Sequence, residues 1–242
     1  MNNSSILRVF KRIAQNILIL FLCCSVSGCL ILMVTGPANL ENTQPDYQKK
    51  SPKNSTPQHF SGVEGSVYTL RGLFDIFSTG MNSLATKIHK QLGLTATPMS
   101  YLEAKRLSAH LIKSYQSGQL QRPIILIGHS YGADMLITVA EDLNDAHIPV
   151  DLIIAIDNTK NQIIPENVRN YYNINSGPSI LHGLIPWGRA LKGASKKTKI
   201  VNVDLMRDKG IFYVNHFNID KLPAVQAYII EIIKSVSLEK AE

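Results

Sequence analysis

The stretch ILIGHSYGADML, residues 125–136, places one serine between two glycines where an apolar run gives way to a helix-like pattern. Gly128, Ser130 and Gly132 match the pattern G-x-S-x-G, which at a strand-to-helix turn exposes a serine hydroxyl. A bulky side chain two residues to either side would collide with so tight a turn. The N-terminus of the following helix favours negative charge that develops nearby. Ser130 is therefore a candidate nucleophile for acyl chemistry, and the plainer interpretation is a tight turn with an incidental serine.

A serine hydroxyl attacks a carbonyl carbon efficiently only when a base takes its proton, so the hypothesis requires a histidine. Two histidines, His182 and His216, follow both the serine and a candidate acid. His216, in YVNHFNID, comes after the last predicted strand and before the last predicted helix. We predict His216 as the base and keep His182, or an ordinary loop role for His216, as alternatives. The other histidines are less suitably placed: His59, His89, His110, His129 and His147.

Two aspartates end predicted strands and could orient the histidine. Asp157 ends the buried strand VDLIIAID and opens the polar turn DNTKN, whereas Asp204 ends the last strand, KIVNVDL. We prefer Asp157 because its strand is the next one along the chain after the nucleophile strand. Asp204, or a Ser-His pair without an acid, remains the alternative. Either aspartate could simply cap the turn that follows it.

Acyl chemistry also needs hydrogen-bond donors for the oxyanion of the tetrahedral intermediate. The geometry of the turn at Ser130 predicts the backbone N–H of Tyr131 as one donor. The second is expected from the loop RGLFDIF, where Gly72 lets the chain turn sharply. Leu73 is the preferred residue, and Phe74 is the alternative.

These residues need a scaffold, and the rest of the pattern predicts one. Short apolar runs alternate with amphipathic stretches of helix length, which indicates parallel strands joined by right-handed crossovers. The sequence therefore predicts a three-layer α/β fold whose sheet has about six strands, with ligands at the carboxyl ends of the strands. The predicted strands are 66–70, 95–101, 123–128, 150–157, 167–175 and 199–205, and the predicted helices are 81–93, 102–118, 131–144 and 222–236.

From about Val67 to the last helix the chain resembles the α/β-hydrolases. The stretches RGLFDIFSTGM, GHSYGAD and VNHFNID together resemble bacterial lipase-like or thioesterase-like serine hydrolases, often with lipoprotein signals. The resemblance implies a Ser-His-acid hydrolase that acts on an ester, thioester or amide. One departure concerns the acid, because the usual strand here ends in Asn175-Ser176-Gly177 without a carboxylate. Asp157 stands at a variant position that some members of the superfamily use.

The N-terminus has the layout of a secretory signal. Arg8, Lys11 and Arg12 precede the apolar run IAQNILILFLCC, which ends in VSGC. That ending resembles a bacterial lipobox, so residues 1–28 are predicted to be a signal peptide and Cys29 the lipidated residue. The alternative is an uncleaved membrane anchor, since LILMV prolongs the apolar stretch. Either interpretation places the functional domain outside the cytoplasm, lipid-anchored or membrane-anchored in a bacterial cell envelope and facing the periplasm or exterior.

Composition divides the rest of the chain. Residues 29–65, rich in Pro, Asn, Gln, Ser and Thr, are predicted to be a flexible tether, and residues 66–242 the catalytic domain. Within the domain, residues 176–198 form a long insertion with Gly, Pro and apolar side chains. A loop of that length is usually functional or disordered. We expect a flap over the site or a membrane-facing patch, and a surface loop with its own small apolar cluster is the alternative.

Charge and motifs exclude several partners. The formal net charge of +7 includes the basic residues of the predicted signal, and the remaining excess is too mild to favour nucleic acid. No H-E-x-x-H, no Cys/His cluster and no glycine-rich phosphate loop is present, so no metal and no cofactor is predicted. The basic cluster at 192–199 is predicted to be a solvated loop, with contact to anionic lipid as the alternative.

Together these features predict a membrane-tethered serine hydrolase whose partner is an acyl-ester or thioester substrate. Ser130 would attack the acyl carbonyl, His216 would move the proton, Asp157 would orient His216, and the amides of Tyr131 and Leu73 would hold the oxyanion. Two alternatives use the same sequence features. One is a cell-envelope binding protein that keeps the fold without catalysis, and the other is an acyltransferase with the same triad.

Overall fold

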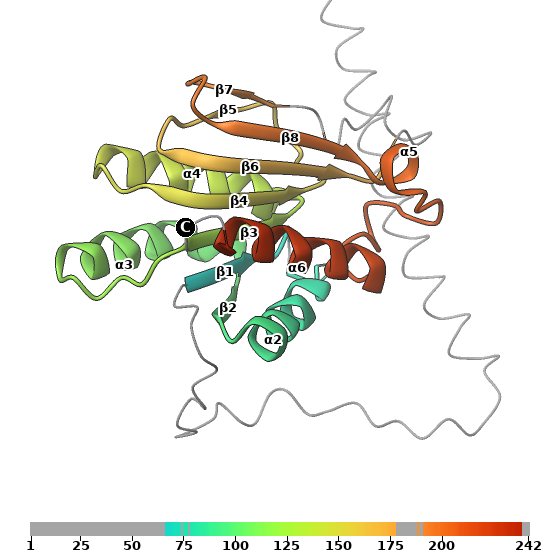
Figure 1. Ribbon diagram of the computed structural model, residues 1–242, viewed down its shortest axis with the longest axis horizontal. Helices are drawn as coiled ribbons and strands as arrows, with labels where there is room; N and C mark the ends of the chain where they lie inside the picture. The colour runs from blue at the N-terminus through green and yellow to red at the C-terminus, as the bar shows by residue number, and fades with distance from the viewer. Residues whose placement is uncertain (1–65, 74, 77, 178–187, 189–190, 239–242) are drawn as a thin grey trace, which may run out of the picture. The chain divides into compact units, whose positions relative to one another are not determined.

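The computed structural model describes residues 66–73, 75–76, 78–177, 188 and 191–238 (Figure 1). All of them belong to one of the two compact units of the chain, Pro57–Glu242. The predicted signal peptide with Cys29 and the predicted tether lie outside the described residues. So do His182, the alternative base, and much of the predicted insertion.

A six-stranded sheet with parallel pairing throughout forms the centre of this unit, in the order β2-β1-β3-β4-β6-β8. The chain runs from β1 outward to β2, returns to β3 on the other side of β1, and continues outward from there. The strand order therefore reverses between β1 and β3, and a crevice at such a point is where open α/β sheets bind ligands. The strands are β1 (Ser66–Leu70), β2 (Thr95–Met99), β3 (Ile124–His129), β4 (Val150–Ile156), β6 (Val168–Asn175) and β8 (Lys199–Asp204).

Helices cover both faces of the sheet, which makes three layers (Figure 1). Helices α2 (Gly80–Leu92) and α6 (Pro223–Leu238) pack on one face, and α3 (Ala104–Gln116) and α4 (Tyr131–Asp145) pack on the other. The predicted fold class, a three-layer α/β fold with a mostly parallel central sheet of about six strands, is confirmed. Each of these strands and helices begins and ends within a few residues of its predicted bounds.

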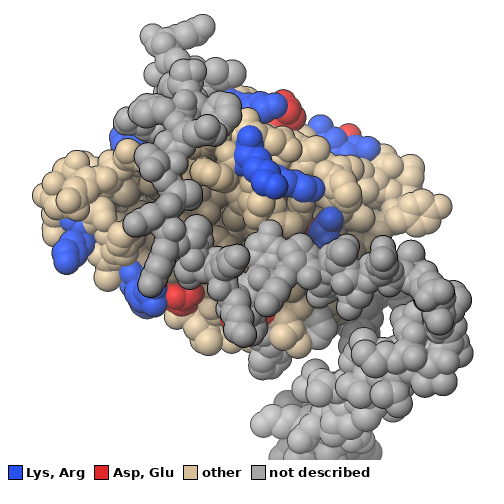
Figure 2. Space-filling model, turned by 90° about the horizontal axis from the view of Figure 1, so that it is seen from below, with Lys and Arg blue, Asp and Glu red and all other residues tan. Residues whose placement is uncertain are grey.

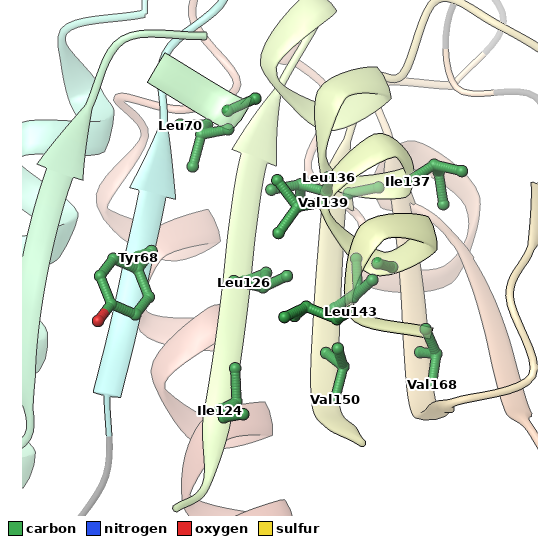
Figure 3. Close-up of a cluster of buried hydrophobic side chains, with 14 of the residues drawn as sticks. Tyr68, Leu70, Ile124, Leu126, Leu136, Ile137, Val139, Leu143, Val150 and Val168 are labelled. Atoms are coloured by element: carbon green, nitrogen blue, oxygen red, sulfur yellow. The ribbon is translucent and has the colours of Figure 1, made fainter. Parts of the chain in front are cut away.

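The central strand β3 explains why the pattern had little polar alternation. Successive side chains of a strand point to opposite faces, and here both faces are buried. Ile124 and Leu126 join the apolar cluster under α3 and α4, shown in Figure 3, while Ile125 and Ile127 join the cluster under α2 and α6. Burial on both faces fixes the position of β3 in the sheet, and therefore the position of the turn at Ser130 that follows it.

Four short elements have no counterpart in the prediction. They are a 3-10 turn at Tyr101–Glu103, β5 (Ile163–Ile164), β7 (Lys192–Gly193) and α5 (Leu205–Lys209). Strand β7 belongs to the predicted insertion 176–198 and pairs in parallel with β5, so part of that insertion joins a small second sheet. Two-residue strands have no measurable period, which is why the sequence pattern does not predict them.

Two surface features can be stated for the described residues. None of their helices is both long and apolar enough to cross a membrane. On the face shown in Figure 2, Lys and Arg side chains lie in small separate groups with uncharged surface between them.

Candidate active site

The turn between β3 and α4 holds Ser130 in a backbone conformation that L-residues rarely adopt. Its φ is 58° and its ψ is −128°. Hydrogen bonds on both sides secure this conformation: the N–H of Ser130 donates to the carbonyl of Ile156 at 2.8 Å, and the N–H of Ala133 donates to the carbonyl of Ser130 at 2.9 Å. Ser130 thus stands at the carboxyl end of β3, beside the point where the strand order reverses.

The two glycines of the motif are required by close backbone contacts. A Cβ on Gly128 would lie 2.7 Å from the backbone of Gly132 and Ala133, so this glycine makes room for the start of α4. A Cβ on Gly132 would lie 2.5 Å from the carbonyl oxygens of Leu70 and Arg71, at the end of β1. The second glycine therefore lets α4 approach the neighbouring strand, a reason that the local turn alone did not indicate.

Because backbone atoms cannot move aside as a flexible side chain can, we expect Gly132→Ala to lower the free energy of unfolding by about 3 kcal/mol. Gly118→Ala is the matched control. Unlike Gly132, Gly118 faces open space: nothing lies within 4 Å of a Cβ added there. Its φ of +69° is nevertheless one that L side chains rarely adopt. Strain at that φ alone should cost about 1 kcal/mol. Urea unfolding followed by circular dichroism measures both, and equal losses would contradict the crowding explanation.

The structure brings the three residues predicted for catalysis together. The hydroxyl of Ser130 and Nε2 of His216 are 2.9 Å apart, and Nδ1 of His216 is 3.3 Å from Oδ2 of Asp157. His216 is 8% exposed and Asp157 is fully buried. The residues come from three separate parts of the chain: the end of β3, the end of β4, and the segment between α5 and α6. They form one continuous line of polar contacts.

Asp157 is held firmly in this line. It follows β4 with a φ of 45°, and its N–H donates to the carbonyl of Ile174 at 2.9 Å. Its Oδ1 accepts the N–H of Ser176 at 2.8 Å, which leaves Oδ2 directed at His216. A buried carboxylate needs such partners, and this one has them on both oxygens.

The competing acid has another structural role. Asp204 is the N-cap of α5, where its Oδ1 accepts the N–H of Arg207 at 3.0 Å. Asn175, at the position where the usual acid would stand, accepts the N–H of Gly177 at 3.0 Å and closes a turn.

The loop after β1 lies against the turn at Ser130. A Cβ built on Gly72 would be 3.0 Å from the Cβ of Ser130. The N–H of Gly72 donates to the hydroxyl of Ser78 at 3.0 Å, so Leu73 is the next residue whose amide could serve the oxyanion. The side chain of Leu73 is 45% exposed. Tyr131, the other predicted donor, begins α4, and its ring packs edge-on against Tyr101 at 5.3 Å.

Asp134, which the sequence pattern did not indicate as a site residue, supports the loop that follows Asp157. Its Oδ1 accepts the backbone N–H groups of Thr159 and Lys160 at 2.9 and 3.0 Å, and its Oδ2 accepts the hydroxyl of Thr159. Burial raises the pKa of Asp134, and the hydrogen bonds from Thr159 and Lys160 oppose that rise. Because α4 begins at Ser130, Asp134 links the start of that helix to the loop that follows Asp157.

A second carboxylate fastens the segment that carries His216. Oδ2 of Asp220 accepts the N–H of Gly80 at 2.8 Å, at the start of α2. The side chain of Asp220 is 1% exposed, and its Oδ1 has no hydrogen-bond partner among the described residues. Burial, the largest influence, raises the pKa of this carboxyl from 3.8 to about 6.

The raised pKa of Asp220 predicts a pH-dependent stability. The folded chain holds the proton of Asp220 more tightly than the unfolded chain does. The protonated carboxyl therefore stabilises the folded state fully below about pH 4, and this stabilisation is lost as the pH rises through about 6. Asp220→Asn keeps an oxygen for Gly80 but cannot ionise. From about pH 4.5 to about pH 7.5, its free energy of unfolding should improve relative to wild type by about 2 kcal/mol. Urea unfolding at both pH values measures this, and a pH-independent difference would contradict it.

Among the described residues, no group of three or more His, Cys, Asp or Glu side chains is placed to hold a metal ion.

Comparison with solved structures finds matches at low sequence identity. A protein described as a candidate hydrolase of the α/β superfamily from Xanthomonas campestris pv. campestris is 16% identical, with 71% of this chain and 99% of that chain covered and a TM-score of 0.45. The RedJ thioesterase of the prodiginine pathway in Streptomyces coelicolor is 9% identical, with 83% and 97% covered and a TM-score of 0.38. The type II thioesterase BorB from the borrelidin biosynthetic cluster is 14% identical, with 44% and 48% covered and a TM-score of 0.30.

No protein-family model matches the sequence, and no curated protein matches it. These likenesses are too distant to assign the chain to a family.

Proposed function

We propose that the protein is a serine hydrolase that cleaves a carboxylic ester or thioester through an acyl-serine intermediate. One observation carries the proposal: Ser130, His216 and Asp157 form a single line of polar contacts at 2.9 and 3.3 Å, with the serine on a strained turn at the carboxyl edge of the sheet. This is the arrangement in which a base activates a hydroxyl and is itself oriented by a third group.

In the first step, the hydroxyl of Ser130 attacks the acyl carbonyl while Nε2 of His216 takes its proton. Asp157 accepts the Nδ1–H of His216, which keeps Nε2 free of a proton beforehand and stabilises the imidazolium that forms. The carbonyl oxygen becomes an oxyanion, which the backbone amides of Tyr131 and Leu73 would bind. Each such donor typically contributes about 3 kcal/mol to transition-state stability.

In the second step, the tetrahedral intermediate collapses and the bond to the leaving alcohol or thiol breaks. His216 gives its proton to the leaving group, so the histidine is neutral again and the acyl group stays on Ser130. Water then attacks the acyl-serine with His216 once more as the base. The products are a carboxylic acid and the restored serine hydroxyl.

The direct test of this function is turnover by the purified full-length chain. We expect steady-state hydrolysis of p-nitrophenyl butyrate and of a butyryl thioester, and loss of both activities in His216→Gln. His110→Gln, a change to an exposed histidine on α3, is the matched control and should retain activity. If the folded wild-type chain cleaves neither substrate, or if it transfers the acyl group only to an added alcohol or amine, hydrolysis is not its function.

A further inference from the structure

A second pairing of serine and histidine lies next to the proposed triad. The hydroxyl of Ser78 is 2.8 Å from Nδ1 of His129. Both side chains are buried, with 2% and 1% of their surface exposed. Ser78 comes just before α2 and His129 is the last residue of β3, so the pair joins two segments that are far apart in the chain. The proposed mechanism gives neither residue a role.

The proton in this pair can be assigned from its partners. The hydroxyl of Ser78 already accepts the N–H of Gly72 at 3.0 Å, and its single proton then has Nδ1 of His129 as its acceptor. With that proton donated to Nδ1, the ring of His129 is neutral and carries its own proton on Nε2. Burial, reinforced by the nearby His216, lowers the pKa of His129 to about 3.

The pair touches both halves of the proposed machinery. On one side, the ring of His129 lies against the ring of His216, with centroids 4.9 Å apart and planes tilted by 40°. On the other side, Gly72 fits between Ser78 and Ser130: a Cβ on Gly72 would lie 2.9 Å from the hydroxyl of Ser78 and 3.0 Å from the Cβ of Ser130. The Ser78 hydroxyl therefore sets the distance between the loop after β1 and the nucleophile.

We infer that Ser78 and His129 are positioning residues for the reaction proposed above. Ser78 holds the amide of Gly72, and with it the loop that presents the amide of Leu73 to the oxyanion. His129 supplies the acceptor that fixes the Ser78 hydroxyl, and its ring supports the ring of His216.

The neutral state of His129 suits this position. When His216 becomes an imidazolium during catalysis, a second positive charge 4.9 Å away would repel it, whereas a neutral ring does not. A purely apolar side chain at position 129 could fill the same space but would leave the hydroxyl of Ser78 without its acceptor. The hydrogen bond between His129 and the hydroxyl of Ser78 is therefore the property that an apolar residue of similar size could not replace.

The inference predicts a loss in kcat rather than in KM. In the full-length chain, Ser78→Ala should lower kcat for p-nitrophenyl butyrate by about 10- to 100-fold, because small displacements of catalytic groups have effects of that size. KM should stay within about twofold, since Gly72 and Leu73 act on the transition state. Ser108→Ala, which removes another buried serine hydroxyl, one bonded within α3 to the carbonyl of Ala104, is the matched control and should leave kcat unchanged.

A pair of His129 variants separates positioning from simple packing. Asn can place an oxygen near the position of Nδ1, so His129→Asn should recover a large part of the activity that His129→Leu loses. Long-range proton–nitrogen NMR spectra of the wild-type imidazoles at neutral pH should show His129 as the tautomer protonated on Nε2. An Nδ1-protonated His129 would contradict the assignment.

The outcomes distinguish this inference from the function on which it rests. Wild-type turnover that needs Ser130 but is unchanged in Ser78→Ala overturns the positioning role and leaves the hydrolase intact. Equal losses in His129→Asn and His129→Leu, or a loss confined to KM, also overturn it. If the folded wild-type chain shows no Ser130-dependent turnover, the proposed function fails and the inference falls with it.

Discussion

Ser130→Ala is expected to lower kcat/KM for ester hydrolysis by about 10⁴-fold or more while the fold is retained. The substitution removes one oxygen, and alanine faces the same backbone strain as serine at a φ of 58°. The hydrogen bonds that secure the turn come from backbone groups, so they persist without the hydroxyl. Initial rates with p-nitrophenyl butyrate, together with the circular dichroism spectrum and the urea midpoint, check both halves of this expectation.

A double variant makes the result specific to a shared mechanism. When Ser130 and His216 act as one unit, adding His216→Gln to Ser130→Ala should cause little further loss, because either change alone disables the nucleophile. Additive losses would indicate that the two residues contribute independently. Substantial remaining activity in Ser130→Ala would mean that another group attacks the substrate.

Asp157→Asn is expected to lower kcat by about 10⁴-fold with little change in folding, because an amide can donate to Nδ1 of His216 and hold the ring in the wrong tautomer. The contact at stake is the one between Oδ2 of Asp157 and Nδ1 of His216, at 3.3 Å. Asp204→Asn is the matched control. It changes the other candidate acid but keeps an oxygen for the N–H of Arg207 at the start of α5, so its activity should be close to that of wild type.

The two aspartate variants also test the alternatives from the sequence. Loss of activity in Asp204→Asn with retention in Asp157→Asn would reverse the assignment. Wild-type activity in both variants would indicate a Ser-His pair that works without an acid. Steady-state rates on matched amounts of folded protein distinguish these results.

The main parts of the fold could be predicted because they depend on local patterns. The unbroken apolar run at β3 indicated a strand buried on both faces, and Ile124 to Ile127 divide between the two apolar clusters as such a strand requires. The G-x-S-x-G stretch indicated the position of Ser130 because the tight turn requires glycines at fixed positions, two residues before and two residues after the serine. Chain order then selected His216 and Asp157, and the structure brings them beside Ser130.

Other parts of the site could not be predicted because they depend on contacts between distant segments. Ser78 and His129 are 51 positions apart, and Gly80 and Asp220 are 140 apart, with no motif that links either pair. Asp134 was visible only as part of GHSYGAD, and its spacing gave no sign that it would bind the loop after β4. Such contacts follow from how strands and helices are ordered in space, which sequence periodicity does not specify.

Covalent capture by a serine-directed reagent shows whether Ser130 is an activated nucleophile. The purified full-length chain is treated with a fluorophosphonate, and the adduct is located by intact mass and peptide mapping. We expect one adduct per chain, on Ser130, absent in Ser130→Ala and formed much more slowly in His216→Gln. A folded wild-type chain that remains unlabelled, or an adduct on a residue other than Ser130, would contradict it.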